Sequence, residues 1–361
     1  MQPFQPHKLP IKNLDWTRFI HLIGESNREV ARFDGLLQSM QNPGVLLSPL
    51  TTQEAVLSSK IEGTQVTLQE VLEFEADPTE HAEKHDDIEE VLNYRKAMHY
   101  AVENLDKVSF SGRLIKGVHS ILLDGVRGEN KDRGNFRSGQ VHIGKSKKIE
   151  EASYVPPAPH DIADAFSNLE RYCHETEKDD LVQLAIIHAQ FEIIHPFWDG
   201  NGRVGRIILP LFLYFKKVLT SPMFYLSAYF EKNRDEYYQY LKGVSEKNDW
   251  ESWIEYFLQA VVTQAKENVI KAKAIHSLYD QKKNRIVGLT HSQFAIQALD
   301  FLFSFPIFTS SQFYERSNIP VATAKRILEV LEKGEVIKMV KEGKGRKGRV
   351  YIFPKLIKIT G

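Results

Sequence analysis

The stretch HPFWDGNGRVGR, residues 195–206, lies between two apolar segments and decides how this chain is interpreted. It follows LVQLAIIHAQFEII and precedes RIILPLFLYF, and both segments have the length and composition of buried helices. Pro196 cannot continue the first helix, and Gly200 and Gly202 allow a tight turn before the second helix. The stretch is therefore predicted to be a loop that presents free backbone N–H groups at a helix N-terminus, an arrangement that binds anions.

Four side chains of this loop form a set that suits phosphoryl transfer. Arg203 and Arg206, three residues apart, share one face of the second helix and can bind phosphate oxygens in a bidentate manner. Asp199 supplies the oxygen ligand that Mg²⁺ bridging two phosphates would need. His195, at the end of the first helix, can accept a proton near neutral pH. Each residue alone is typical of ordinary structure, but their combination predicts a phosphoryl-transfer site.

The composition is that of a soluble globular protein. The 361 residues are 42% hydrophobic and 26% charged, and their net charge of zero gives no whole-molecule argument for binding nucleic acid or membranes. The single Cys173 excludes an internal disulfide and a cysteine-based zinc cluster. There is no secretory signal, and the longest apolar run is nine residues. We therefore expect a cytoplasmic protein with no membrane partner.

Helical periodicity dominates the chain and predicts a mainly α fold. Thr51 followed by Glu54 is a capping-box pattern for a helix over about 51–63, which Gly63 would end. Thr67 with Glu70 begins the next helix in the same way. Further helices are expected from Asp86, then at about 111–124, 160–176, 180–194, 202–217 and 231–246, with a long one from near Asp249 into the 270s or 280s.

One internal segment interrupts the helical pattern. DRGNFRSGQVHIG places the strand-forming Phe136, Val141 and Ile143 around Ser138 and Gly139. This alternation about a small turn predicts a β-hairpin.

The composition changes again after about residue 288. THSQFAIQALDFL, SSQFYERSNI and VATAKRILEVLEKGE predict three short helices, and VIKMVKEGKGRKGRVYIF predicts a hairpin with a basic, glycine-rich tip. Three helices and a two-stranded wing are typical of a winged-helix domain. Its candidate DNA-phosphate contacts are Lys325, Arg326, Arg346 and Lys347. A protein-binding module or a solvated basic face is the alternative.

The loop matches the signature H-P-F-x-[DE]-G-N-G-R-x-x-R at every fixed position, and the chain therefore resembles the Fic family. The helical pattern over about 86–247 also resembles the Fic core. Together with the C-terminal pattern, the resemblance implies a Fic-type helical bundle with a small β-hairpin flap. Its parts would be an N-terminal region (1–85), the catalytic core with trailing helices (86–285) and a winged-helix domain (286–361). Members typically transfer AMP from ATP to a hydroxyl side chain of a target protein.

The resemblance also implies residue roles. His195 would deprotonate the Ser, Thr or Tyr hydroxyl of the target, and Asp199 would hold Mg²⁺ on the phosphates of ATP. The nucleotide would be bound by Gly200, Asn201, Gly202, Arg203 and Arg206. The hairpin resembles the family's flap, which aligns the target by strand addition, here through Gln140, Val141, His142 and Ile143.

A second motif lies nearer the N-terminus, where SSKIEG, residues 58–63, matches the family's inhibitory pattern [S/T]-x-x-x-E-[G/N]. A carboxylate is disfavoured at a helix C-terminus, so Glu62 needs another explanation. The resemblance implies that Glu62 pairs with Arg206, which would otherwise bind the γ-phosphate, and that Ser58 supports the helix before Gly63 ends it. The enzyme would then be autoinhibited.

Several alternatives remain open at this stage. In some relatives the inhibitory glutamate also assists removal of AMP, so the same site could work in both directions. Another nucleotide or phosphate donor is one alternative to ATP. A DNA-binding regulator with the Fic core as a sensor is another. Self-modification and a homodimer are both compatible with the sequence.

Overall fold

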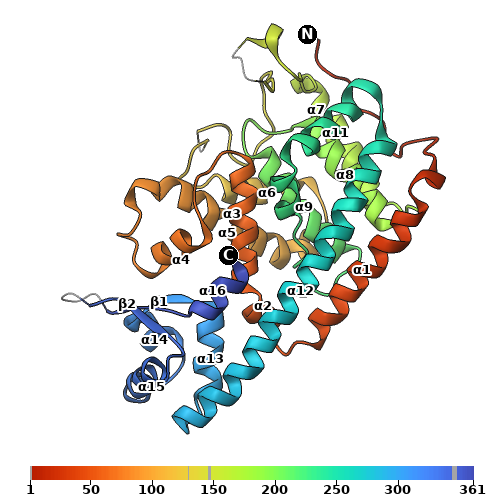
Figure 1. Cartoon of the computed structure of the whole chain (residues 1–361). Coiled ribbons are helices and arrows are strands. Elements are labelled where there is room, and N and C mark those ends of the chain that lie inside the picture. The colour runs from red at the N-terminus through yellow and green to blue at the C-terminus, as the bar shows by residue number, and fades with distance from the viewer. Residues whose placement is uncertain (1, 129, 145–147, 344–347) are drawn as a thin grey trace.

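The computed structural model describes residues 2–128, 130–144, 148–343 and 348–361, and it is mainly helical, as predicted (Figure 1). The α-helices are α1 (Ile20–Ser39), α2 (Pro43–Leu46), α3 (Ser48–Ile61), α4 (Leu68–Ala76), α5 (His85–Val108), α6 (Gly112–Leu122), α7 (Ile162–His174), α8 (Asp180–Ile194), α9 (Asn201–Phe215), α10 (Ser227–Lys232), α11 (Arg234–Lys247), α12 (Trp250–Thr290), α13 (Ala295–Ser304), α14 (Ser310–Arg316), α15 (Val321–Lys333) and α16 (Pro354–Thr360). The 3-10 helices are η1 (Trp16–Arg18), η2 (Ala82–Lys84), η3 (Ile149–Glu151) and η4 (Pro159–Asp161), and the strands are β1 (Ile307–Thr309), β2 (Lys338–Lys341) and β3 (Val350–Ile352).

The core is built around α8 and α9, the helices on either side of the 195–206 loop. Nearly every side chain of α8 is buried, because this helix is apolar on all sides and packs against α7, α9 and α12. The 41-residue α12 extends through much of the molecule with α1 lying along it (Figure 1). None of the described helices combines the length and apolarity needed to cross a membrane. The loop is thus held between two buried helices of the core.

The helix predicted over about 51–63 is α3, which begins earlier, at Ser48. The predicted capping box of Thr51 and Glu54 is wrong. Glu54 is buried and accepts hydrogen bonds from the backbone nitrogen (3.2 Å) and hydroxyl (2.5 Å) of Ser227. A partner 173 residues away in sequence has taken the carboxylate that local spacing assigned to a cap.

The other predicted capping box, Thr67 with Glu70, is confirmed at the start of α4. From there α4 packs on the C-terminal sheet. Leu68 and Leu72 of α4 contact Ile307 and Val350 in a small apolar cluster separate from the main core. The turn between α3 and α4 therefore links the SSKIEG motif to α4, which packs on the C-terminal sheet.

The predicted β-hairpin flap is wrong for the described residues of that segment. They contain one isolated antiparallel bridge, between Ile143 and Tyr154, instead of a paired hairpin. The buried side chain of Arg137 explains the difference, because it donates hydrogen bonds to the carbonyl oxygens of His195 (2.9 Å) and Pro157 (2.6 Å). The segment is fastened to its surroundings and does not pair with itself.

The C-terminal region has the predicted three short helices, α13, α14 and α15, followed by β2 and β3. A further strand, β1, makes the sheet three-stranded in the order β1-β3-β2, with both pairings antiparallel. The sequence pattern did not indicate β1 because Ile307–Thr309 is only three residues long. This succession of elements is compatible with a winged helix, and that assignment stays a prediction.

Candidate active site

The loop between α8 and α9 is fixed by hydrogen bonds within it and by the packing of a buried ring. The side chain of Asn201 accepts a hydrogen bond from the backbone nitrogen of Phe197 (2.9 Å) and donates one to its carbonyl oxygen (2.8 Å). Phe197 is fully buried, and its ring stacks on His119 with 3.8 Å between centroids. The side chain of Asn201 therefore acts on the loop itself, and its predicted role in phosphate binding stays a prediction.

His195 ends α8 in a left-handed backbone conformation, with φ of 48°. Its Nδ1 lies 3.4 Å from the carbonyl oxygen of Glu192, which favours the tautomer in which Nδ1 carries the proton and Nε2 is basic. Burial lowers the pKa of His195 to about 4, so that the ring is neutral at pH 7. A neutral imidazole with a basic Nε2 can accept a proton.

Arg206, in the second turn of α9, is hydrogen-bonded to Ser58 and Glu62 of the SSKIEG motif. Its Nε donates to Ser58 Oγ (2.8 Å), and its Nη2 donates to the Ser58 carbonyl oxygen (2.9 Å) and to Glu62 Oε1 (2.7 Å). Arg206 is 1% exposed, whereas the side chain of Glu62 is 33% exposed. The contact between Glu62 and Arg206 that the motif implied is present, and Ser58 binds the same guanidinium instead of only supporting the helix.

The electrostatics of this pair follow from its burial. Burial alone would raise the pKa of Glu62, but the charge of Arg206 and its hydrogen bond outweigh burial and hold the pKa below its ordinary value. Gly63 follows Glu62 with φ of 105°, and its N–H donates to the Lys60 carbonyl oxygen (3.0 Å), which ends the helix as expected. Glu62 is therefore ionised at neutral pH and directed at α9.

Glycine at two positions of α9 allows carboxylates to approach the helix. A Cβ at Gly202 would overlap Glu62 Oε1, and a Cβ at Gly205 would overlap Glu192 Oε1. Gly200, the residue just before α9, has a φ of 75°, and no side-chain hydrogen bond caps this helix start among the described residues. The backbone N–H groups at the start of α9 thus lie beside Glu62, in the place that the loop was predicted to offer to phosphates.

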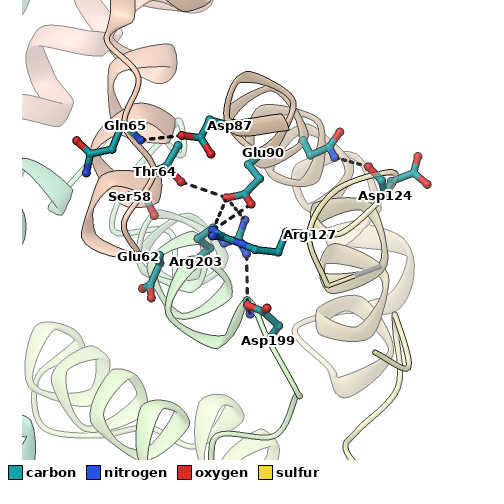
Figure 2. Close-up of polar contacts among 12 residues, drawn as sticks. Ser58, Glu62, Thr64, Gln65, Asp87, Glu90, Asp124, Arg127, Asp199 and Arg203 are labelled. Carbon is teal, nitrogen blue, oxygen red and sulfur yellow. Dashed lines mark hydrogen bonds and ion pairs between the residues drawn. The ribbon is translucent and has the colours of Figure 1, made fainter. Parts of the chain in front are cut away.

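Arg203, one turn before Arg206, is bound by different residues (Figure 2). Its Nη1 lies 3.1 Å from Glu90 Oε2, and its Nη2 lies 3.6 Å from Asp199 Oδ1. Both Arg203 and Glu90 have side chains that are at most 2% exposed. The two arginines predicted to bind phosphate are therefore each paired with a separate glutamate.

Asp199 is the only predicted metal ligand, and its side chain is 28% exposed. Its Oδ1 accepts a hydrogen bond from the nitrogen of Gly200 (2.7 Å), and Lys131 Nζ lies 3.4 Å from Oδ2. No group of three or more His, Cys, Asp or Glu side chains suited to a metal occurs among the described residues. One accessible carboxylate fits Mg²⁺ that arrives with the phosphates, since Mg²⁺ is usually held by one or two carboxylates together with substrate phosphates.

The segment predicted as the target-docking flap lies next to the loop. Gln140 donates hydrogen bonds to the carbonyl oxygens of Val141 (3.0 Å) and Pro156 (2.8 Å). Val141 and His142 are half-buried, and Ile143 is 40% exposed. The predicted docking role of these residues stays a prediction.

The predicted DNA contacts differ in their availability. Lys325 is exposed on α15, but the exposed Arg326 donates a hydrogen bond to the carbonyl oxygen of Thr290 (3.1 Å) at the end of α12. Arg346 and Lys347 lie outside the described residues. On α15, Lys325 is therefore the more available of the two residues, and the DNA role of all four residues stays a prediction.

Sequence reasoning missed Glu90 and Glu192. Glu90 continues the buried helical stripe of Tyr94, Ala97 and Ala101, where an acidic residue is a signal that the periodicity could have revealed. Glu192 is the sole acid in the apolar run before the loop, and its Oε1 is buried without a hydrogen-bond partner among the described residues. Burial raises the pKa of Glu192 to about 8, despite the nearby charge of Arg206. Each acid could have been recognised from the sequence, because it interrupts an otherwise apolar pattern.

Comparisons with known proteins indicate the family of the chain. Residues 20–103 match the family model described as Fic/DOC family N-terminal, and residues 109–213 match the Fic/DOC family model, so that together they cover more than half of the chain. A probable protein adenylyltransferase of Aquifex aeolicus is 29% identical over 201 residues, covering 55% of this chain and 57% of that relative. The protein adenylyltransferase Fic of Drosophila melanogaster is 28% identical over 165 residues, covering 45% of this chain but 30% of the fly protein. The chain thus matches less than two thirds of the length of either relative.

Solved structures show the same fold. A Fic family protein from Desulfovibrio desulfuricans has a TM-score of 0.62 at 20% identity, with 98% of both chains covered. A Fic domain containing signaling protein from Bacteroides thetaiotaomicron has a TM-score of 0.52 at 16% identity, covering 69% of this chain and 97% of that one. With its two family matches, its complete signature loop and this fold, the chain belongs to the Fic/DOC family.

Proposed function

We propose that this chain transfers AMP from ATP to a Ser, Thr or Tyr hydroxyl of a target protein, and that Glu62 holds it inactive. The observation that carries the proposal is the contact of the partly exposed Glu62 with the buried Arg206, beside the neutral His195 and the uncapped start of α9. Two relatives that share the family are named protein adenylyltransferases, which supports the same activity here.

The residues of the site suit a transfer of AMP in which pyrophosphate is the leaving group. The target hydroxyl oxygen attacks the α-phosphorus of ATP, the bond from that phosphorus to the bridging oxygen of the β-phosphate breaks, and pyrophosphate leaves. His195 Nε2 takes the hydroxyl proton as the new bond forms. Asp199 would hold Mg²⁺, which supplies positive charge to the phosphates, and the amides at the start of α9 bind phosphate oxygens. Most of the rate enhancement then comes from positioning and charge.

Inhibition follows from competition for one guanidinium. While Arg206 is bound by Glu62 and Ser58, the donors on its Nε and Nη2 are occupied and compete with the γ-phosphate. The carboxylate of Glu62 also lies over Gly202, where it would repel an incoming phosphate. ATP can then bind only in a way that leaves its α-phosphate poorly aligned for attack.

The proposal is tested by self-labelling with α-³²P-ATP and by labelling of proteins in a cell extract. We expect Glu62→Gly to raise labelling about 5–150-fold, the range of a typical coupling between sites. His195→Ala in the same background should abolish it. Lys60→Ala is the matched control, because it removes an exposed ion pair of the same turn, with Glu231 (2.8 Å), but keeps the helix former alanine and leaves Glu62 in place, and it should label like wild type. Equal labelling by wild type and Glu62→Gly would refute the inhibitory role.

Mass spectrometry of the labelled protein tests the donor and the acceptor together. An added mass of AMP on a Ser, Thr or Tyr side chain is expected. An added mass of a different nucleotide or of phosphate alone would favour a Fic enzyme with another donor.

DNA binding through the C-terminal region is a second candidate function. It is favoured by Lys325, which is exposed on the helix α15 that a winged helix would place in a DNA groove. Salt-dependent binding to duplex DNA in a gel-shift assay, weakened by Lys325→Ala, is the expected result. Binding that is insensitive to both salt and Lys325 would argue against it.

A further inference from the structure

Glu90 is a buried carboxylate that joins three segments at the candidate active site (Figure 2). Its Oε2 accepts hydrogen bonds from Thr64 Oγ1 (3.1 Å) and Arg203 Nη1 (3.1 Å), and Arg127 Nη2 lies 3.2 Å from its Oε1. Thr64 lies in the turn after the inhibitory helix, Arg127 follows α6, and Arg203 lies in the first turn of α9. The family signature and the inhibitory motif both leave Glu90 out.

We propose that Glu90 is a positioning residue that directs the guanidinium of Arg203 toward the nucleotide phosphates. The proposal rests on the proposed AMP transfer, since it concerns the same site. A guanidinium is a rigid planar fork, so anchoring Nη1 on Glu90 fixes the direction of its other nitrogens. Nη2 is thereby held beside Asp199, the predicted Mg²⁺ ligand. Glu90 touches no reacting atom and acts through Arg203.

The place of Glu90 in the fold separates it from the inhibitory glutamate. Glu90 lies on α5, which packs against α6 and α9 within the core. Its side chain is 1% exposed, so neither Glu90 nor Arg203 can turn into water without disturbing the core. Glu90 therefore stays on Arg203 when the carboxylate of Glu62 is moved or removed, and an arginine that is already oriented loses less conformational entropy on binding phosphate.

The same helix offers a matched control. Asp87, one turn before Glu90, accepts a hydrogen bond from the backbone nitrogen of Gln65 (2.9 Å) in the same turn that Thr64 belongs to (Figure 2). Asp87 thus resembles Glu90 in charge, helix and contact with the turn. No contact between Asp87 and Arg203 occurs among the described residues, so replacing Asp87 tests the turn without the arginine.

The experiment compares Glu90→Gln with Asp87→Asn in the Glu62→Gly background. The two readouts are the Kd of a non-hydrolysable ATP analogue with Mg²⁺ and the KM and kcat of labelling by ATP. We expect Glu90→Gln to raise the Kd and KM about tenfold, as loss of a hydrogen bond to a charged group would, with a smaller change in kcat. Asp87→Asn should leave the Kd, the KM and the kcat unchanged.

A cycle with Arg203 distinguishes positioning from general support of the fold. In an Arg203→Ala background, Glu90→Gln should produce no further change in Kd, because the group through which it acts is gone. Glu90→Asp keeps the charge but shortens its reach, and it provides the same Kd test should Glu90→Gln fail to fold. Kd values for both Glu90 variants within twofold of Asp87→Asn would overturn the proposal. Failure of Glu62→Gly to label at all would instead refute AMP transfer, and the Kd comparison would still decide the role of Glu90.

Discussion

Arg203 and Arg206 lie one turn apart on α9, yet the glutamates that hold them belong to very different parts of the molecule. Glu62 follows the end of α3, has a side chain that is one-third exposed, and shares its arginine with Ser58 of α3. Glu90 lies within α5, is almost fully buried, and also binds Thr64 and Arg127. Under the two proposals, a pair of one glutamate and one arginine is a removable competitor at Arg206 and a permanent orienting contact at Arg203. The difference lies in how the carboxylate is attached to the core.

The largest expected difference between the two pairs is in stability. Glu90→Ala leaves Arg203 buried without its main partner and should lower the free energy of unfolding by about 3–5 kcal/mol. Glu62→Ala should cost about 1–3 kcal/mol, because Arg206 keeps its two Ser58 acceptors and gains access to water. Urea denaturation followed by circular dichroism measures both losses, with Asp87→Ala as a control at a half-buried acid that does not contact either arginine. Equal losses of unfolding free energy for the two glutamates would contradict the proposed difference between the two pairs.

A second test uses the close approach of Glu62 to α9. Gly202→Ala adds a Cβ that overlaps Glu62 Oε1, and it should lower the free energy of unfolding by about 1–3 kcal/mol. In the Glu62→Gly background the same substitution should cost clearly less, because the carboxylate it collides with is absent. An identical cost in both backgrounds would show that Glu62 does not rest on Gly202 in solution.

A smaller effect is expected from Ser58, the other residue on Arg206. Ser58→Ala removes the acceptor of Arg206 Nε and should cost about 1–2 kcal/mol of unfolding free energy. Labelling should rise by about fivefold, less than with Glu62→Gly. Ser59→Ala is the control, because the neighbouring hydroxyl is equally buried but has no hydrogen-bond partner among the described residues. Equal labelling by the two serine variants would exclude a role for the Ser58 hydroxyl.

The smallest expected effect concerns pH. A general base is active at pH values above its pKa and loses activity as the pH falls through that pKa. The pKa of His195 is lowered to about 4. The kcat/KM of Glu62→Gly should therefore stay nearly constant between about pH 5.5 and 7.5. A decline in kcat/KM of about tenfold as the pH falls from 7.5 to 5.5 would indicate an ordinary histidine pKa. His195 would then be more accessible to water than the structure shows.

The fold class and the central loop were predictable because their signals are local. The chemistry of the loop lies in twelve consecutive residues, and periodicity with capping patterns such as Thr67 and Glu70 located most of the helices. The contact of Glu62 with Arg206 was predicted only through the family resemblance, since nothing in the spacing of residues 144 positions apart indicates it. The misplaced cap at Glu54 and the absent hairpin have one cause: a buried side chain found a distant partner that local rules do not consider.

The sequence by itself determined a helical protein with a phosphate-binding loop, because helix periodicity, proline and glycine act over a few residues. Only the tertiary structure decided which carboxylate meets which arginine. The pair of Glu90 and Arg203 spans 113 residues and exists because α5 and α9 pack side by side. Buried charges require a partner wherever the fold places them, and that requirement is satisfied in three dimensions and not along the chain.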